Sequence, residues 1–206
     1  TSATDNYNVA VGFQAGVNVT TGTNNTLIGG LAGDAITTGG YNVAVGATAL
    51  TANTTASFNT AVGYQAAYSN TTGADNTAMG TAAMYPNTTG NYNAAFGSAS
   101  LRQNTTGSFN TALGQSALNQ NTTASNNTAV GYQASYSNTT GTRNTAVGDR
   151  ALQDNTTAHD NSAFGHQALT NNTTGASNVA VGRQALTANT TASYNTALGY
   201  QAGLNA

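Results

Sequence analysis

The chain repeats itself with a strict period of 17 residues. The pattern Asn, any residue, Ala, an apolar residue, Gly begins at Asn8 and returns every 17 residues up to Asn195, twelve times without insertion or deletion. Leu27 is the only departure from Ala at the third position. A register held over so many copies indicates that each copy occupies an equivalent place in a stack. We number the positions of one unit from 1 to 17, starting at its Asn, and call the residues that share a position a column.

The length of the unit selects the fold class. Seventeen residues are too few for a helix pair but suit one coil of a solenoid, in which short strands alternate with turns. We therefore expect an all-β chain, a parallel β-solenoid (β-roll) of about 12 coils that forms a single repeat domain over residues 1–206. Strands are expected near positions 2–4 and 7–9. At about 4.8 Å per coil, the stack would be roughly 58 Å long.

Four positions of the unit indicate where the core lies. Position 4 is apolar in every unit, from Val11 to Leu198, and position 9 is mostly Leu, Met, Ala or Gly, so we expect both columns to be buried. Gly at position 5 never varies, which predicts a corner where a Cβ would clash or φ must be positive. Position 8 is Ala in all units but one, which has Ser100, and indicates a thin core. Stacking of neighbouring coils must then supply the stability.

Composition limits the function classes. The chain has six Asp, four Arg, no Glu, no Lys and a net charge of −2, so it has no electrostatic footprint for nucleic acid. No apolar run approaches the roughly 18 residues of a membrane span, so we expect no membrane insertion. The absence of Cys excludes disulfides and thiolate metal sites. We expect no cofactor and no bound metal.

Acid–base residues are few. Asp149, His166 and Arg183 share position 6 in three successive units, and Arg143 stands one unit before Asp160 at position 17. The first group lacks a nucleophile, and a thin rod offers no deep cleft. We interpret both groups as surface ion-pair rows and expect no catalytic site and no enzymatic activity.

Asn residues recur in two columns. The Asn of position 1 never varies, which predicts an internal amide ladder or a turn residue in the left-handed helical region. At position 12, Asn-Thr-Thr recurs as an Asn-x-Thr sequon, for example at Asn53 and Asn70. We expect these Asn side chains in a turn, accessible to a glycosylating host. The structural alternative is that Asn is simply a turn former.

Aromatic residues concentrate at positions 6, 10 and 17, which vary freely and which we interpret as outward-facing or corner columns. Exposed aromatic rings are suited to contacts with glycans or protein surfaces. Stacked ladders along the solenoid are the structural alternative. The candidate binding residues are Tyr64, Tyr68, Tyr132, Tyr136 and Tyr200.

A Thr pair at positions 13 and 14 is unbroken in 11 units. It suits a hydroxyl ladder with high β propensity. It also suits a flat, weakly charged Thr surface of the kind found in β-solenoid ice-binding proteins. A second row of Thr would be expected at position 2, but five units have another residue there. The candidate ice-binding row is Thr54, Thr71, Thr88, Thr105, Thr122, Thr139, Thr156, Thr173 and Thr190.

The repeat resembles a known family. The sequence NVAVGATAL at 42–50, and NTAVGYQA at 59–66 and 127–134, resemble the head repeats of YadA-like trimeric autotransporter adhesins. The family motif is approximately Asn-Ser-Val-Ala-Ile-Gly-x-x-Ser/Ala, and residues 44–49 lie on its second half. The repeats are also similar to those of phage tail-fibre shafts. The resemblance implies a left-handed parallel β-roll, three chains to a trimer, and a role in attachment.

These observations favour a structural or attachment protein: the repetitive head or shaft of an extracellular adhesin or phage tail fibre. Its place would be extracellular, on a cell surface or a virion. The alternatives are an ice-binding solenoid that uses the Thr row and a self-assembling extracellular filament. The expected partners are further copies of the chain, as a trimer or an end-to-end filament, and a glycan or protein of a host surface.

Overall fold

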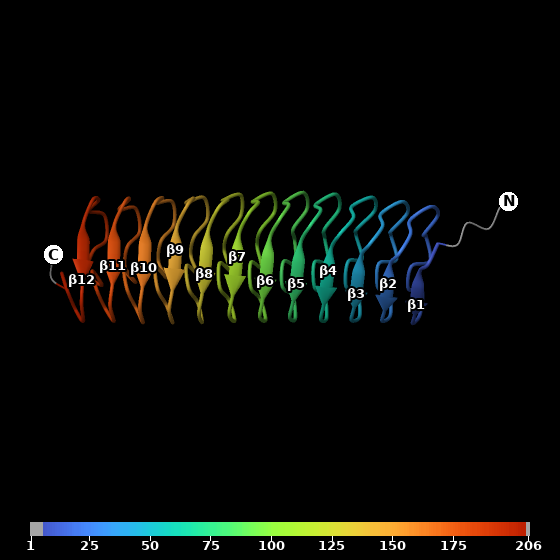
Figure 1. The fold of residues 1–206 in the computed structure, drawn as a ribbon, viewed down its shortest axis with the longest axis horizontal. Coiled ribbons are helices and arrows are strands. Elements are labelled where there is room, and N and C mark those ends of the chain that lie inside the picture. Colours follow the sequence, from blue (N-terminus) through green and yellow to red (C-terminus); the bar gives the residue numbers. More distant parts are fainter. Residues whose placement is uncertain (1–5, 205–206) are drawn as a thin grey trace.

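A computed structural model describes residues 6–204, which form a rod-shaped parallel β-solenoid (Figure 1). Each 17-residue unit contributes one short strand, and the strands stack in sequence order in a single 12-stranded sheet. The described residues include no helix. The strands are β1 (Val9–Val11), β2 (Thr26–Ile28), β3 (Val43–Val45), β4 (Thr60–Val62), β5 (Thr77–Met79), β6 (Ala94–Phe96), β7 (Thr111–Leu113), β8 (Thr128–Val130), β9 (Thr145–Val147), β10 (Ser162–Phe164), β11 (Val179–Val181) and β12 (Thr196–Leu198).

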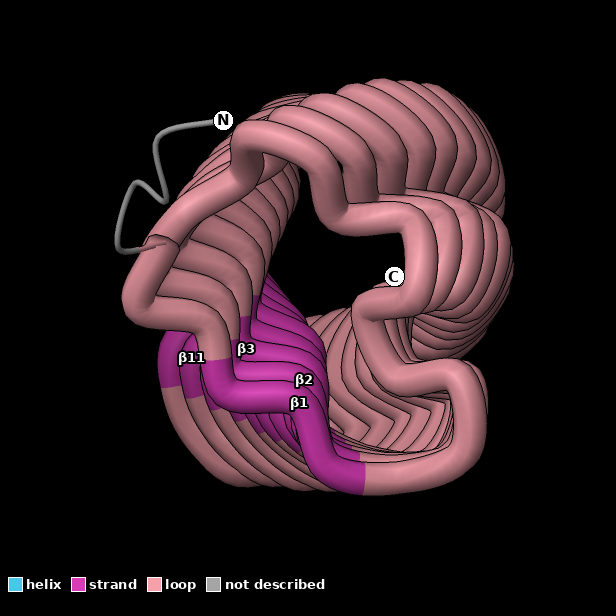
Figure 2. The backbone as a smooth tube through the Cα atoms, turned by 90° about the vertical axis from the view of Figure 1, so that its right-hand side faces the viewer, coloured by secondary structure: helices cyan, strands magenta, loops and turns pink. Residues whose placement is uncertain are grey.

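The register between neighbouring strands never shifts. Each strand residue pairs in parallel with the residue 17 positions further on, as Thr60 does with Thr77 and Ala61 with Ala78. Residues of one column therefore lie one above another along the rod. Figure 2, which looks along the rod, shows that each coil repeats the outline of the one before it with a small displacement, which accumulates between β1 and β11. The predicted fold class and the predicted 17-residue coil are confirmed.

The expectation of a second strand at positions 7–9 is wrong, because this segment forms a turn. Positions 7 and 9 have left-handed backbone, as in Gln65 with φ of 57° and Ala67 with φ of 48°, and such residues bend the chain. Coil-to-coil hydrogen bonds persist here nonetheless. The amide of Ala67 donates to the carbonyl of Ala83 over 2.9 Å. The turns thus hold neighbouring coils together without strand geometry.

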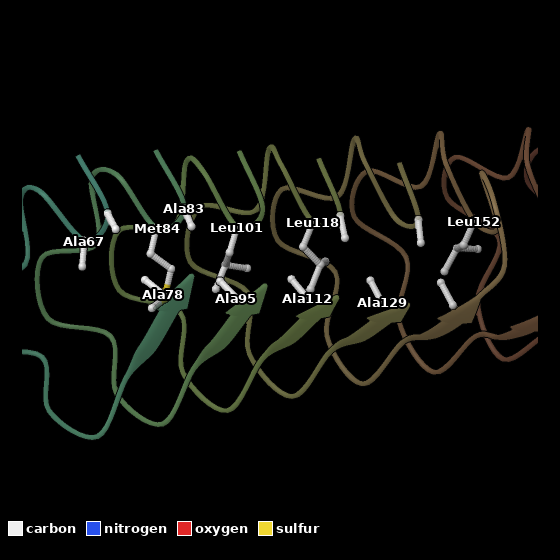
Figure 3. Packing of buried hydrophobic residues seen from close by; sticks show 14 of the residues in the cluster. Ala67, Ala78, Ala83, Met84, Ala95, Leu101, Ala112, Leu118, Ala129 and Leu152 are labelled. Carbon is white, nitrogen blue, oxygen red and sulfur yellow. The ribbon is translucent and has the colours of Figure 1, made fainter. Parts of the chain in front are cut away.

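The interior is lined by position 3 rather than position 4. The column of position 3 is buried from Leu27 to Ala197 and exposed only in the first coil, at Ala10, whereas Val62 is half-buried and Leu113 is 48% exposed. The expectation of a buried column at position 4 is therefore wrong. Side chains of positions 2 and 4 lie on one face of the sheet and those of position 3 on the other, as in any β-strand. Figure 3 shows the reason: Leu101 and the other large side chains of position 9 reach across the thin interior to the strand. Only a small residue fits beneath them.

The predicted burial of positions 8 and 9 is confirmed. Ala66 and Ala117 of position 8 are fully buried, as are Leu50 and Leu118 of position 9. At the first and last described coils, neighbours are missing on one side, and Ala15 of position 8 is only partly buried. Burial of these small and large side chains therefore depends on stacking between coils, as expected for a solenoid.

One exchange of volume explains the single break in the Ala column. Leu27 occupies position 3 in β2, and position 9 is Gly in that coil and in the coil before it. A Cβ on Gly33 would lie 2.7 Å from Leu27 Cδ2 and 2.8 Å from Ile36 Cδ1. A Cβ on Gly16 would lie 2.6 Å from Leu27 Cδ1. The large side chain has moved from the turn to the strand, which keeps the core filled.

The invariant Gly of position 5 meets both conditions expected of it. Gly131 has φ of +136°, and a Cβ there would lie 2.4 Å from the carbonyl oxygen of Gly148 in the next coil. A real Cβ cannot approach a backbone oxygen so closely. The column therefore needs Gly for its backbone conformation and for the close approach of the next coil.

The Asn of position 1 forms the predicted internal amide ladder. The buried Asn59 side chain accepts a hydrogen bond from the backbone amide of Asn76 over 3.0 Å. Its Nδ2 donates to the carbonyl of Gly73 over 2.9 Å. The side chain thus ties its own coil to the next one and closes the coil on itself.

The sequon Asn side chains of position 12 form a second buried ladder. Asn104 has no solvent exposure, and its Nδ2 donates to Asn87 Oδ1 over 2.7 Å and to the carbonyl of Gly107 over 2.9 Å. The expectation that these sequons are accessible is wrong for the folded chain, because the amide nitrogen that would carry a glycan points into the rod.

Candidate binding surface

The rod offers its outer surface and no cavity. Over residues 6–204 there is no pocket, and no group of three or more His, Cys, Asp or Glu side chains could hold a metal ion. The same residues include no helix that could cross a membrane. Any recognition by this part of the chain must therefore use the columns that face outward.

Position 6 carries three of the candidate Tyr residues. Tyr64 is 54% exposed. The guanidinium carbon of Arg150 lies 5.6 Å from the ring centroid of Tyr132, and that of Arg183 lies 5.6 Å from the ring of Tyr200. These are cation–π distances. Two of the three rings are thus already engaged by an Arg of the chain itself.

Position 10 carries the other two candidate Tyr residues, both half-buried. Tyr68 stacks on Tyr85 with ring centroids 5.0 Å apart and planes 6° from parallel. Tyr136 occupies the same position four coils after Tyr68. The structure therefore places the five candidates in two columns and does not gather them into one patch.

Position 17 holds two further aromatic pairs, which were not among the candidates. Tyr41 stacks on Phe58 at 5.1 Å, and Tyr92 stacks on Phe109 at 5.0 Å. All four side chains are 56–57% exposed. Their signal in the sequence is two aromatic residues spaced 17 apart in a variable column. Asp75 stands alone between the two pairs.

The predicted row of Asp149, His166 and Arg183 forms only in part. His166 Nε2 lies 3.7 Å from Asp149 Oδ1. Arg183 points away from His166, because its guanidinium lies over Tyr200. Both members of the remaining pair are more than 40% exposed, so the contact is a surface one.

Arg143 and Asp160 form the predicted surface ion pair. Arg143 Nε donates to Asp160 Oδ1 over 2.7 Å, and Nη2 donates to Oδ2 over 2.9 Å. These hydrogen bonds hold the pKa of the Asp160 carboxyl below its ordinary value and raise the pKa of Arg143. Both side chains are exposed, so the pair fixes local geometry more than it stabilises the fold.

The candidate Thr row of position 13 lies half-buried along most of the rod, with its hydroxyl groups engaged. Thr71 Oγ1 donates to the carbonyl of Thr88 over 2.9 Å, and Thr88 Oγ1 donates to that of Thr105 over 2.9 Å. The predicted hydroxyl ladder is thus present, with backbone carbonyls as acceptors. The Thr column that is exposed in every coil is position 14: Thr21, Thr38, Thr55, Thr72, Thr89, Thr106, Thr123, Thr140, Thr157, Thr174 and Thr191.

The outer face of the sheet is an uncharged stripe, made of positions 2 and 4 of every coil. Its residue types are limited to Thr, Ser, Ala, Val, Ile, Leu, Met and Phe. At position 4, Ile28 is 39% exposed, Phe164 41% and Leu198 79%. Position 4 thus forms an apolar row at the surface, beside the mostly Thr row of position 2, and contiguous exposed apolar patches mark interaction sites in soluble proteins. The signal in the sequence is the invariant apolar character of position 4, which taken alone predicts a buried column.

No protein-family model, no curated protein and no solved structure matches this chain.

Proposed function

We propose that this chain is the repetitive head or shaft segment of an extracellular attachment fibre, of the adhesin or phage tail-fibre kind, in which copies of the chain lie side by side. One observation carries the proposal: position 4 is apolar in all twelve coils, yet it lies on the outside of a single chain. A column under no packing constraint would admit charged residues, as positions 6 and 17 do. We infer that the column is covered in the assembled protein.

A second copy of the chain suits this stripe because it has the same period. Two stripes with equal coil spacing match at every coil, whereas a partner with another repeat loses register within a few coils. A stripe roughly 58 Å long and about 10 Å wide, the length of a three-residue strand, presents on the order of 600 Å² per chain, which is the lower end of the range for stable interfaces. The absence of charge means that no ion must be desolvated when the faces meet.

The attachment role is supported by the distribution of variation between inner and outer columns. Positions 1, 3, 5 and 8, which build the interior and the corner, are nearly constant, whereas positions 6, 10 and 17 vary from coil to coil. A rod without a pocket is suited to holding binding groups at a distance, in an ordered array. Contacts with a glycan or protein of a host surface would come from the variable columns.

The experiment that tests the proposal is the mass of the purified protein by light scattering. We expect a defined multimer, and its mass decides between a dimer and the expected trimer. Phe96→Glu, Leu113→Glu and Phe164→Glu together should give a monomer with unchanged circular dichroism. A matched control places Glu at three exposed Thr residues of the same coils and should stay multimeric: Thr106→Glu, Thr123→Glu and Thr174→Glu.

A monomeric unmodified protein would refute side-by-side association. A mass that grows without limit as concentration rises would favour the filament alternative. Retention of the multimer by the triple Glu variant of position 4 would show that the copies meet on another face.

Ice binding remains the second candidate, favoured by the unbroken exposed Thr column of position 14. Position 13 does not add a free second rank, because its hydroxyl groups donate to backbone carbonyls. If position 14 binds ice, replacement of Thr72, Thr89 and Thr106 by Tyr should abolish inhibition of ice recrystallisation and preserve the fold. The attachment proposal expects no ice activity at all, so clear ice shaping by the unmodified protein would reverse the ranking.

A further inference from the structure

Asp75 interrupts a run of aromatic rings on the outside of the rod. Over five successive coils, position 17 reads Tyr41, Phe58, Asp75, Tyr92 and Phe109. All five residues have left-handed backbone, with φ between 56° and 62°, and all five are exposed. Because the backbone geometry is the same in each coil, the five side chains leave the rod in the same direction. The carboxylate thus stands where a ring would otherwise continue the stack.

The spacing of the rings defines the size of the gap. Stacked neighbours in this column have centroids 5.0–5.1 Å apart, one coil per ring. Phe58 and Tyr92 are two coils apart, so their centroids are separated by about 10 Å. The Asp75 side chain is shorter than a phenyl ring, so we infer that it leaves part of this space open. We call this gap the Asp75 notch, bounded by Phe58, Asp75 and Tyr92.

The carboxylate of Asp75 has no cation beside it. Within residues 6–204 it makes no hydrogen bond or ion pair, whereas Asp160, in the same column, is held by Arg143 of the preceding coil at 2.7 Å. An Arg at position 17 can therefore reach a carboxylate at position 17 of the next coil. At Asp75 the neighbouring coils supply rings instead.

We propose that the Asp75 notch binds an organic cation, an alkylammonium or guanidinium group. A cation at the place of the missing ring would lie about 5 Å from both ring centroids, within the roughly 6 Å over which cation–π attraction acts. The Asp75 carboxylate beneath it supplies the opposite charge. The chain already uses this attraction internally, where Arg150 and Arg183 lie over Tyr rings.

Two sources could present this chemistry: the Arg or Lys side chain of a partner protein, or the trimethylammonium of a choline-type headgroup. The notch gives the proposed attachment fibre a ligand class, and its biological role rests on that proposal. The binding itself does not require assembly, because Phe58, Asp75 and Tyr92 belong to one chain.

The test is a nuclear magnetic resonance titration of the whole chain with tetramethylammonium chloride, methylguanidinium chloride and, at equal ionic strength, sodium chloride. We expect saturable shifts of the Phe58 and Tyr92 ring signals, with half-saturation on the order of 10 mM, from either organic cation and none from sodium. The better ligand identifies the source: tetramethylammonium indicates a choline-type group, and methylguanidinium indicates an Arg side chain.

Variants separate the notch from general charge effects. Asp75→Asn should weaken binding about fivefold, and Tyr92→Ala should do so by a similar factor. Asp154→Asn removes the same charge from an exposed site away from the notch and should leave binding unchanged. Absence of saturable ring shifts, or equal weakening by Asp154→Asn, would overturn the proposal. A monomeric mass in light scattering would refute the fibre and leave these shifts unaffected.

Discussion

Asn70 donates a hydrogen bond from Nδ2 to the Oδ1 of Asn53 over 3.1 Å, inside the rod and away from solvent. The same link joins every neighbouring pair of position 12 from Asn53 to Asn189. Each amide is donor to one coil and acceptor from the next, so the chain of bonds is satisfied except at its ends. A satisfied buried ladder rigidifies the structure, whereas a broken one leaves polar groups unpaired.

Removal of one Asn side chain from this ladder should therefore lower the stability of the fold. Asn104→Ala leaves Asn87 Oδ1 and the carbonyl of Gly107 without this donor, and we expect a loss of about 1–3 kcal/mol in the free energy of unfolding. The measurement is urea denaturation followed by circular dichroism. Gln103→Ala, at the exposed neighbouring residue, is the control and should change stability little. Equal losses in the two variants would contradict the ladder.

The second prediction concerns the Gly residues of position 5, where one Gly of the last coil serves as the control for another in the middle of the rod. Gly131→Ala meets both a positive φ and a backbone oxygen 2.4 Å from the new Cβ. Gly199→Ala meets a positive φ alone, because nothing lies within 4 Å of its Cβ. We expect Gly199→Ala to cost about 1–2 kcal/mol and Gly131→Ala clearly more. Thermal unfolding of the two variants measures the difference, and similar melting temperatures would show that coil-to-coil contact does not constrain this corner.

The Arg143–Asp160 pair predicts a local pH dependence. The pKa of Asp160 is lowered by its hydrogen bonds to Arg143, so the pair's contribution is present above the unfolded pKa of the carboxyl and is lost as pH falls through the folded pKa. Titration of the Asp160 carboxyl by nuclear magnetic resonance should give a value below that of an ordinary Asp. Arg143→Ala should return it to the ordinary range, and Arg102→Ala should not.

Much of the fold could be predicted from the sequence, because the period alone fixes the register. A constant 17-residue unit forces equal coils, and the invariant Gly and small Ala columns locate the corner and the close approach. The inward face of the strand could not be predicted from apolar character. Position 4 is more apolar than position 3, but where position 9 carries a large side chain the thin interior leaves room only for Ala at position 3. The exchange between Leu27 and Gly33 was the signal, because volume is exchanged only between residues that share a space.

The sequence predicts which positions of the unit face outward, but it does not predict which side chains contact one another there. Positions 6 and 17 face outward as expected, whereas position 10 is half-buried in most coils and buried at Asn119 and Thr170. A long side chain can contact the coil before it or the coil after it, depending on its rotamer. The sequence does not determine that rotamer. Arg183 has His166 one coil before it and Tyr200 one coil after it, and it lies over Tyr200. The predicted line of charges therefore breaks at that point.

Two Leu residues of the seventh coil separate the core from the proposed interface. Leu118, at position 9, has no exposure, whereas Leu113, at position 4, is 48% exposed in the single chain. Leu118→Ala opens a cavity in the interior and should lower the free energy of unfolding by about 2–5 kcal/mol in any state of assembly. Leu113→Ala removes the same atoms from the stripe. It should leave a monomer almost as stable as before and weaken association instead.

The measurement for this pair is chemical denaturation and light scattering at several protein concentrations. For Leu113→Ala, we expect the stability loss to fade as the protein is diluted below its association range, because the lost contacts are between chains. For Leu118→Ala, the loss should persist at every concentration. If Leu113→Ala were equally destabilising in a dilute monomer, position 4 would belong to the core after all. If it changed neither stability nor mass, the apolar column would need another explanation than contact between copies.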